Sequence, residues 1–197
     1  PASGRCYLGG LEVTRPSPAE FIAQGVAYVP GDRLGQGLCP GLGAGDNAAL
    51  KQHARPPFSR WGIFHPRAVR GFTRRIIQRY GVKLASLDSP VSLLSGGNLQ
   101  RLILGRELHR QVRLLVAVNP SRGLDIEGIA LMRAKLRQLR QDGVGIVLIS
   151  EDLEELQALS DNLHVIYGGR LSPALPRGSR HTARLGQLMA GVGMGEA

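Results

Sequence analysis

The sequence of 197 residues predicts an α/β fold in which helices cover a parallel sheet. Three features of its second half predict this class. An apolar run over 114–118, bounded by Arg113 and by Asn119-Pro120, is typical of a buried strand, and a second such run covers 145–149. Between them, apolar residues recur at three- and four-residue steps, which indicates an amphipathic helix. Strand, helix and strand in this order form a parallel unit.

The helix between the two strands is predicted from the stripe Ile129, Met132, Leu136 and Leu139, and Asp142-Gly143 provides its stop. A short helix is expected around Leu153, Leu156 and Leu159. Residues 163–167 then predict a strand that runs through a turn at 168–169 into residues 170–171. The tail from 172 to 197 carries little signal.

The first half of the chain is less regular. Short strands are expected at 7–8 and 26–29, around a helix that begins near Ser17-Pro18. Residues 31–65 are rich in Gly, Pro and Arg, and we expect a loop there with one helical turn. Residues 66–80 predict a basic amphipathic helix, whose apolar side consists of Val69, Phe72, Ile76 and Ile77.

The composition limits the classes of function. The chain has 25 Lys+Arg and 15 Asp+Glu, and its formal charge of +10 suits nucleic acid, anionic lipid or an acidic partner. The basic residues are dispersed and aromatic residues make up only 5%, which weighs against nucleic acid. Cys6 and Cys39 are isolated and the histidines are scattered, so neither a disulfide nor a metal site is predicted. No apolar run approaches the roughly 20 residues of a membrane-spanning helix.

The sharpest motif is a glycine-rich turn at 94–101, with the sequence Leu-Ser-Gly-Gly-Asn-Leu-Gln-Arg. The turn leads into a helix with apolar residues at Leu99, Leu102 and Ile103. Two glycines let the backbone approach a ligand, and the first N–H groups of a helix attract anions. An ordinary capped helix start, with Ser95 as N-cap, explains the turn equally well when it is taken alone.

Further motifs follow and precede this turn in a fixed order. The turn resembles the signature motif of ABC ATPases from sugar and nucleoside importers. Its residues 94–98 are called the signature loop below. Residues 119–125 are similar to the end of the Walker B strand and the D-loop of that family. Residues 147–155 resemble its switch strand, and 25–38 resemble the Q-loop region of its second ATPase half. Residues 188–191 resemble its usual ending.

This resemblance implies an ABC-type P-loop ATPase core with a parallel sheet, a short antiparallel β part and a helical subdomain that carries the signature motif. The Gly-x-x-x-x-Gly-Lys pattern of a phosphate-binding loop does not occur in the sequence, so we expect a chain truncated at its N-terminal side. The expected parts are a partial antiparallel β segment at 1–30, the Q-loop region and helical subdomain at 31–110, the Walker B, D-loop and H-loop core at 111–171, and a tail at 172–197.

The family's site residues transfer position by position. The resemblance implies nucleotide contacts from the signature motif at Leu94, Ser95, Gly96, Gly97, Asn98 and Gln100. It implies D-loop roles for Ser121, Gly123, Leu124 and Asp125. The Q-loop region corresponds to Pro30, Gly31, Asp32 and Arg33.

Four positions of the site depart from the family pattern: Val118, Asn119, Glu151 and Gly31. Val118-Asn119-Pro120 stands where the family has Asp-Glu-Pro, and Asn119 cannot accept a proton from an attacking water. Glu151 occupies the switch His position, and Gly31 replaces an acidic residue. These changes imply a half-site that binds or couples rather than hydrolyses, with ATP and Mg²⁺ held mainly by a partner half.

The implied function is the ATP-binding, energy-coupling subunit of an importer of nucleosides or simple sugars, an ATPase in the full-length protein. Its implied partners are a second ATPase half, two membrane permease subunits and, indirectly, a substrate-binding lipoprotein, at the cytoplasmic face of the bacterial membrane. No nucleic acid is expected. Two alternatives stay open. One is a non-transport ABC ATPase that acts on nucleic acid or ribosomes, which the charge of +10 favours. The other is an inactive remnant that binds partners.

Overall fold

The computed structural model describes residues 5–13, 17–177 and 182–194. They belong to two compact units, Pro1–Ile149 and Ser150–Ala197. Each unit has its own secondary structure, and each is described by itself.

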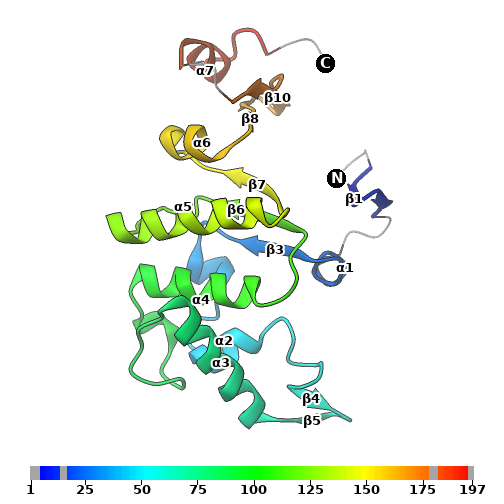
Figure 1. Cartoon of the computed structure of the whole chain (residues 1–197), viewed down its shortest axis with the longest axis vertical. Helices are drawn as coiled ribbons and strands as arrows, with labels where there is room; N and C mark the ends of the chain where they lie inside the picture. The colour runs from blue at the N-terminus through cyan, green and yellow to red at the C-terminus, as the bar shows by residue number, and fades with distance from the viewer. Residues whose placement is uncertain (1–4, 14–16, 178–181, 195–197) are drawn as a thin grey trace. The chain divides into compact units, whose positions relative to one another are not determined.

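A parallel sheet of three strands forms the centre of the first unit (Figure 1). Its strands are β3 (Val26–Val29), β6 (Leu114–Val118) and β7 (Gly145–Ile149), in the order β3-β6-β7. Leu114 lies opposite Val26 on one side and opposite Gly145 on the other. The helix α5 (Ile126–Gln141) connects β6 to β7, which confirms the predicted strand–helix–strand unit.

The buried side of this sheet is made by alternate residues. Ala27, Val29 and Leu115 have no exposed surface, and on α5 the predicted residues Met132, Leu136 and Leu139 are buried. The expectation of a fully buried strand is wrong for β7, where Val147 is 47% and Ile149 50% exposed. The physical reason is the cover by helices: β3 and β7 are both edge strands, but β3 packs against the helices Pro18–Ala23 and Gly96–Leu108, whereas α5 is the main helix that contacts β7.

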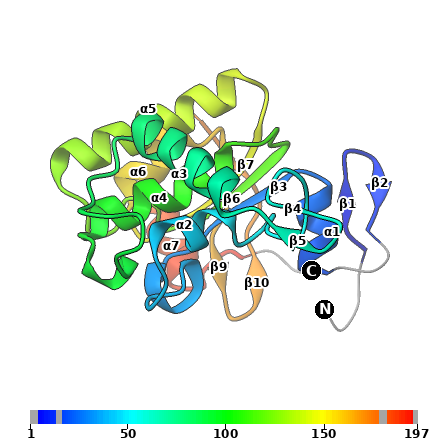
Figure 2. The ribbon, with the colours of Figure 1, turned by 90° about the horizontal axis from the view of Figure 1, so that it is seen from below.

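Three helices pack together beside the sheet and carry the signature motif (Figure 2). They are α2 (Ala44–Ala49), α3 (Pro66–Tyr80) and α4 (Gly96–Leu108), and the 3₁₀ turn η2 (Val91–Leu93) leads into α4. The helix α3 packs tightly on α4 at Gly105, where an added Cβ would collide with Ile76 and lie 3.1 Å from Tyr80 Cδ2. The helical subdomain is therefore held by side chains of α3 against a glycine of α4.

The helix α3 has the predicted bounds. Val69, Phe72 and Ile76 are buried as expected, and Ile77 is half-buried. Gly81 ends the helix with φ of 63°, a left-handed conformation that favours glycine. The arginines of the opposite side are exposed: Arg67, Arg70, Arg74, Arg75 and Arg79.

The beginning of the first unit matches the sequence prediction. The strands β1 (Tyr7–Leu8) and β2 (Leu11–Glu12) form an antiparallel hairpin. Next, α1 (Pro18–Ala23) begins with Pro at its first position, and the side chain of Ser17 accepts a hydrogen bond from Glu20 N at 3.1 Å. Ser17 is thus the N-cap of the helix, which begins where the sequence predicts.

Residues 31–65 contain more structure than the predicted loop. The π-helical turn η1 (Arg33–Gly37), the helix α2 and the hairpin of β4 (Ser59–Arg60) with β5 (Ile63–Phe64) all lie there. The buried Asn47 accepts a hydrogen bond from Cys39 N at 2.7 Å and donates to Leu42 O at 3.2 Å. Bonds between side chain and backbone fold this region, and they leave no periodic apolar pattern in the sequence.

The second unit contains α6 (Leu153–Leu159), two small antiparallel pairs and α7 (Thr182–Met189). The hairpin of β9 (Ile166–Tyr167) with β10 (Arg170–Leu171) confirms the predicted turn. A single strand over 163–167 is wrong, because β8 (Asn162–Leu163) pairs instead with β11 (Leu175–Pro176). Between β8 and β9, the Val165 N–H donates to the Ser172 side chain at 2.9 Å, which interrupts the strand.

Candidate functional site

The signature loop ends at the first turn of α4 and leaves hydrogen-bond donors there. Ser95 is the N-cap residue, but its side chain makes no capping bond to the helix. The first backbone N–H groups, at Gly96 and Gly97, therefore keep their capacity to donate. Together with the positive end of the helix dipole, they form an arrangement that suits a phosphate group.

Asn98 fixes the hydroxyl of Ser95. The Asn98 side-chain amide donates to Ser95 Oγ at 2.9 Å, and Asn98 Oδ1 accepts from Lys83 N at 2.7 Å. Ser95 is exposed, and its oxygen acts as the acceptor in this bond. The O–H of Ser95 is consequently directed away from Asn98, which leaves it able to donate a hydrogen bond.

Arg33 links the Q-loop region to the signature helix and to the D-loop. Its Nε donates to Gln100 Oε1 at 2.7 Å, and its Nη2 donates to the backbone carbonyl of Arg122. A Cβ on Gly96 would lie 3.2 Å from Arg33 Nη1, so glycine leaves room for this close approach. Burial, and then the charge of Arg122, lower the pKa of the Arg33 guanidinium.

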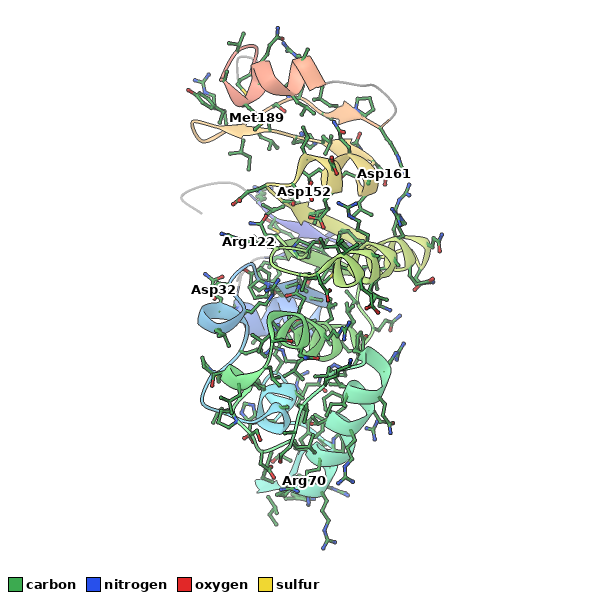
Figure 3. All side chains as sticks on the ribbon, turned by 90° about the vertical axis from the view of Figure 1, so that its left-hand side faces the viewer. Asp32, Arg70, Arg122, Asp152, Asp161 and Met189 are labelled. Carbon is green, nitrogen blue, oxygen red and sulfur yellow. The ribbon has the colours of Figure 1, made fainter. Side chains whose placement is uncertain are left out.

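The D-loop forms a turn that begins α5. Gly123 has φ of 65°, and Leu124 N donates to Ser121 O at 3.2 Å. Asp125 is the N-cap of α5 and accepts from Gly128 N at 2.8 Å. Figure 3 shows Arg122 and Asp32 on the same side of the first unit. Asp32 itself caps η1 by accepting from Gly35 N at 2.8 Å.

The carboxyl ends of β3 and β6 bring Gly31, Val118 and Asn119 together. A Cβ on Gly31 would lie 3.4 Å from Val118 O and 3.7 Å from Asn119 Cβ. Asn119 has φ of 43°, a left-handed conformation that asparagine tolerates better than most residues, and its N–H donates to Ile149 O at 2.7 Å. Neither side chain supplies the carboxylate that Mg²⁺ prefers, so these residues do not fit a Mg²⁺ site.

The remaining catalytic candidate lies in the second unit. Glu151 is exposed, and Ser150 separates it from the end of β7. The next residue, Asp152, caps α6 by accepting from Glu155 N at 3.1 Å. The role of Glu151 at the switch position stays a prediction. Within the described residues, no group of three or more His, Cys, Asp or Glu is arranged to hold a metal ion. None of the described helices is both long and apolar enough to cross a bilayer.

Comparison with known proteins relates almost the whole chain to part of longer transport proteins. The guanosine import ATP-binding protein NupO of Bacillus subtilis is 34% identical over 195 residues, which is 99% of this chain and 38% of NupO. The arabinose import ATP-binding protein AraG of Chromohalobacter salexigens is 36% identical over 183 residues, which is 92% of this chain and 36% of AraG. The chain is related to ABC-importer ATP-binding proteins. It spans less than two-fifths of these relatives' length, and no family model matches it.

The fold comparison agrees with this relation. The ABC cassette MJ0796, solved as a dimer in a post-hydrolysis state with ADP and Pi, superposes with a TM-score of 0.71 at 19% identity. The match covers 91% of this chain and 76% of the cassette. At this identity the likeness shows the fold, and it confirms the predicted ABC ATPase-like α/β class with its short antiparallel parts.

The structure therefore brings three of the predicted ABC motifs into one network. Arg33 of the Q-loop region bonds to Gln100 of the signature motif and to the D-loop backbone at Arg122, and so joins the three motifs. Gln100, expected to contact nucleotide, is only 1% exposed and bonds to Arg33. The sequence did not indicate Lys83, whose backbone N–H orients Asn98, because no motif contains it.

Proposed function

We propose that this chain is part of the ATP-binding, energy-coupling subunit of an ABC importer for nucleosides or simple sugars. In this proposal it donates its signature loop to the ATP site of a partner ATPase half. The relatives named for guanosine, nucleoside, arabinose and ribose import support the substrate class. The other proposed partners are two membrane permeases and, through them, a substrate-binding lipoprotein, at the cytoplasmic face of the membrane.

One contrast carries the proposal. The first turn of α4 has uncapped N–H groups and the exposed hydroxyl of Ser95, so it offers donors to a phosphate. The end of β6 offers Val118 and Asn119 where hydrolysis needs carboxylates. A chain of this kind contributes to hydrolysis by contacting ATP held elsewhere, and its own β6 end contributes little.

In this mechanism, the partner half binds ATP with Mg²⁺ and supplies the attacking water. The N–H groups of Gly96 and Gly97 and the hydroxyl of Ser95 donate to the terminal phosphate of that ATP. These donors stabilise the negative charge that develops during phosphoryl transfer. Arg33 holds Gln100 and the D-loop carbonyl of Arg122 so that the loop keeps its position.

The test is a substitution that blocks the loop in the complete importer. Ser95→Arg places a long side chain where the phosphate would lie, and we expect transport-coupled ATP hydrolysis to fall to background. The matched control is Ser92→Arg, the same change at an exposed residue of η2. Asn119→Ala should leave the rate within about twofold, since an amide gives no general base. Wild-type hydrolysis in Ser95→Arg would refute the proposal.

A further inference from the structure

The hairpin of β4 and β5 exposes apolar side chains next to the start of α3. Trp61 is 88% exposed, Ile63 64% and Phe64 46%. Only His65 lies between β5 and α3, and its N–H donates to Phe58 O at 2.8 Å. Figure 1 shows the hairpin and the start of α3 at the end of the first unit remote from the sheet. Apolar side chains that gather on a surface in this way mark a contact with a protein or a membrane.

Trp61 occupies a position of the hairpin turn that is unfavourable for a bulky residue. Arg60 pairs with Ile63, which leaves a loop of Trp61 and Gly62 between the two strands. These loop residues have φ of 55° and 77°, as in a type I′ turn, where Asn-Gly is the preferred sequence. A bulky side chain at positive φ is strained, and Trp61 is too exposed for burial within the chain to offset this strain. Strain of this kind concentrates at functional sites.

The charged residues of this part of the chain are basic. Residues 51–80 contain no Asp or Glu. The exposed arginines of this segment are Arg55, Arg60, Arg67, Arg70, Arg74, Arg75 and Arg79. Arg70 pairs with Asp88 at 2.9 Å. Arg60, Arg67 and Arg74 have no ion-pair partner among the described residues, so their charges face solvent uncompensated.

These uncompensated arginines flank the apolar tip on both sides. Arg60 is the last residue of β4 and directly precedes Trp61. Arg67 lies in the first turn of α3, and Arg74 lies about two turns further along the same face of that helix. We call the exposed group formed by the tip and its flanking charges the hairpin surface: Arg60, Trp61, Ile63, Phe64, Arg67 and Arg74.

We propose that the hairpin surface binds an anionic membrane directly, with Trp61 inserted among the lipid headgroups. Tryptophan resides at the headgroup level of a bilayer, and arginines attract acidic lipids. Apolar side chains with basic neighbours are therefore the composition of segments that lie in the membrane interface. The inference goes beyond the proposed function and concerns a contact that this chain makes by itself, without permeases.

A lipid layer suits this surface better than an acidic protein or nucleic acid does. An exposed tip needs a fitted hollow in a protein partner, whereas a fluid headgroup layer accommodates it. Arginines spread over a strand and a helix need no fixed counter-charges in a leaflet that is negative throughout. Nucleic acid would require rings for stacking, but Phe58 and Phe72 of this segment are buried against each other at 5.0 Å.

Tryptophan fluorescence tests the insertion, because Trp61 is the single tryptophan of the chain. The intact chain is mixed with vesicles of phosphatidylcholine and phosphatidylglycerol in equal parts, or with vesicles of phosphatidylcholine alone. We expect the anionic vesicles to shift the emission to shorter wavelength, and lipids brominated on their acyl chains to quench it. Neutral vesicles should give neither effect, and high salt should reverse the binding, because salt screens the arginines.

A substitution at the tip separates binding from folding. Trp61→Asn removes the inserted ring and gives the turn its preferred residue. Flotation with the anionic vesicles should therefore weaken by at least about tenfold, while the urea midpoint of unfolding should not fall. The matched control is Tyr7→Asn, which removes another aromatic residue of the first unit that is 56% exposed. This control should bind the vesicles like the wild type.

A pair of substitutions tests the charges. Arg67→Gln combined with Arg74→Gln should weaken binding about 25-fold, at about fivefold for each arginine near an anionic surface. Arg137→Gln combined with Arg170→Gln makes the same change of net charge at exposed residues outside the hairpin surface. This control pair should keep the wild-type affinity, because the contact depends on where the charges lie.

The outcomes separate a membrane contact from other partners and from the proposed function. An emission of Trp61 that the anionic vesicles leave unchanged would overturn the inference. Equal binding to neutral vesicles would do so as well, and so would a shift that appears with RNA or with the permease subunits in detergent but not with vesicles. Loss of flotation in Trp61→Asn, with Tyr7→Asn still bound, supports it. Ser95→Arg should bind vesicles like the wild type, so this result stands even if the proposed function fails.

Discussion

The two ends of α4 differ in how completely the chain satisfies its own polar groups. At the amino end, the first N–H groups are uncapped and the Nε2 of Gln100 has no partner among the described residues. At the carboxyl end, Glu107 has no exposed surface and is fully engaged. Its carboxylate accepts from Lys51 Nζ at 2.7 Å, from Arg106 Nε at 2.9 Å and from Tyr28 N at 3.3 Å.

This difference separates stability from function along one helix. At the carboxyl end, the buried carboxylate of Glu107 joins α4 to β3 and to Lys51, which follows α2. The bonds of this carboxylate are all made within the chain. The amino end holds donors that fit a ligand. Substitutions at the carboxyl end should therefore unfold the protein, and substitutions at the amino end should change binding or hydrolysis without unfolding it.

The largest effect is expected from Glu107→Ala. This change leaves Arg106, which is 5% exposed, and Lys51 without their buried counter-charge. Removal of one partner from a buried ion pair costs about 3–5 kcal/mol, so the free energy of unfolding should fall by that amount. Urea or guanidinium denaturation measures it.

The control is the exposed pair of Arg70 with Asp88, whose side chains are 53% and 69% exposed. Figure 3 shows Arg70 at the end of the first unit remote from the sheet. Asp88→Ala should lower the free energy of unfolding by about 0–1 kcal/mol, because solvent screens such pairs. Equal losses in Glu107→Ala and Asp88→Ala would remove the distinction between the buried and exposed pairs.

At the amino end, Arg33→Met should affect hydrolysis more than stability. The change removes the bonds to Gln100 Oε1 and to the Arg122 carbonyl, which link α4, the helix that follows the signature loop, to the D-loop. Loss of such charge-assisted bonds should lower kcat of the complete importer about tenfold. KM should change little, because in the proposed function the partner half binds most of the ATP. Steady-state ATPase measurements separate the two parameters.

Two further variants qualify that result. Arg33→Lys keeps the charge and one of the two bonds, so it should recover part of kcat. Arg70→Met removes an exposed arginine of the same size and should keep the wild-type rate. A wild-type kcat in Arg33→Met, or an equal loss in Arg70→Met, would show that the network around Arg33 does not position the loop.

Periodicity explains which parts of the fold the sequence predicted. The strands β6 and β7 and the helices α3 and α5 have regular apolar patterns, and the bounds of β6, β7 and α3 agree with the prediction. The short helix α2 has no such pattern, because the buried amide of Asn47 holds it against Cys39, Leu42 and Gly43. A side chain that bonds to several backbone groups leaves no signal beyond a single asparagine.

The candidate site shows a similar limit. The signature motif and the D-loop are short and contiguous, so the sequence alone predicts their residues, and their roles stay predictions. The bonds of Arg33 join residues 67 and 89 positions apart, which no local pattern indicates. Tyr80 and Lys83 line a cavity beside the signature loop for the same reason, since the packing of α3 on α4 at Gly105 brings them there.

The smallest expected effect concerns acid and the carboxyl end of α4. His109 lies edge-on to the Phe72 ring at 4.7 Å and contacts the Gln52 side-chain amide and the Arg106 carbonyl. Burial lowers the pKa of His109 below its ordinary 6.5. The Nδ1–H of His109 donates to the Arg106 carbonyl, and the Nε2 of the neutral ring accepts from the Gln52 amide. Protonation of the ring would add a hydrogen at Nε2, facing the amide hydrogen of Gln52.

The lowered pKa fixes the direction of the pH effect. Between the folded pKa and 6.5, the unfolded chain binds more protons than the folded chain, so acid favours unfolding. The contribution of His109 is complete above about pH 6.5 and is lost as the pH falls. Urea unfolding at about pH 7.5 and about pH 5.5 should show a smaller loss of stability in His109→Gln than in the wild type. His53→Gln, at an exposed histidine, should keep the wild-type loss, and an unchanged loss in His109→Gln would exclude His109 as its source.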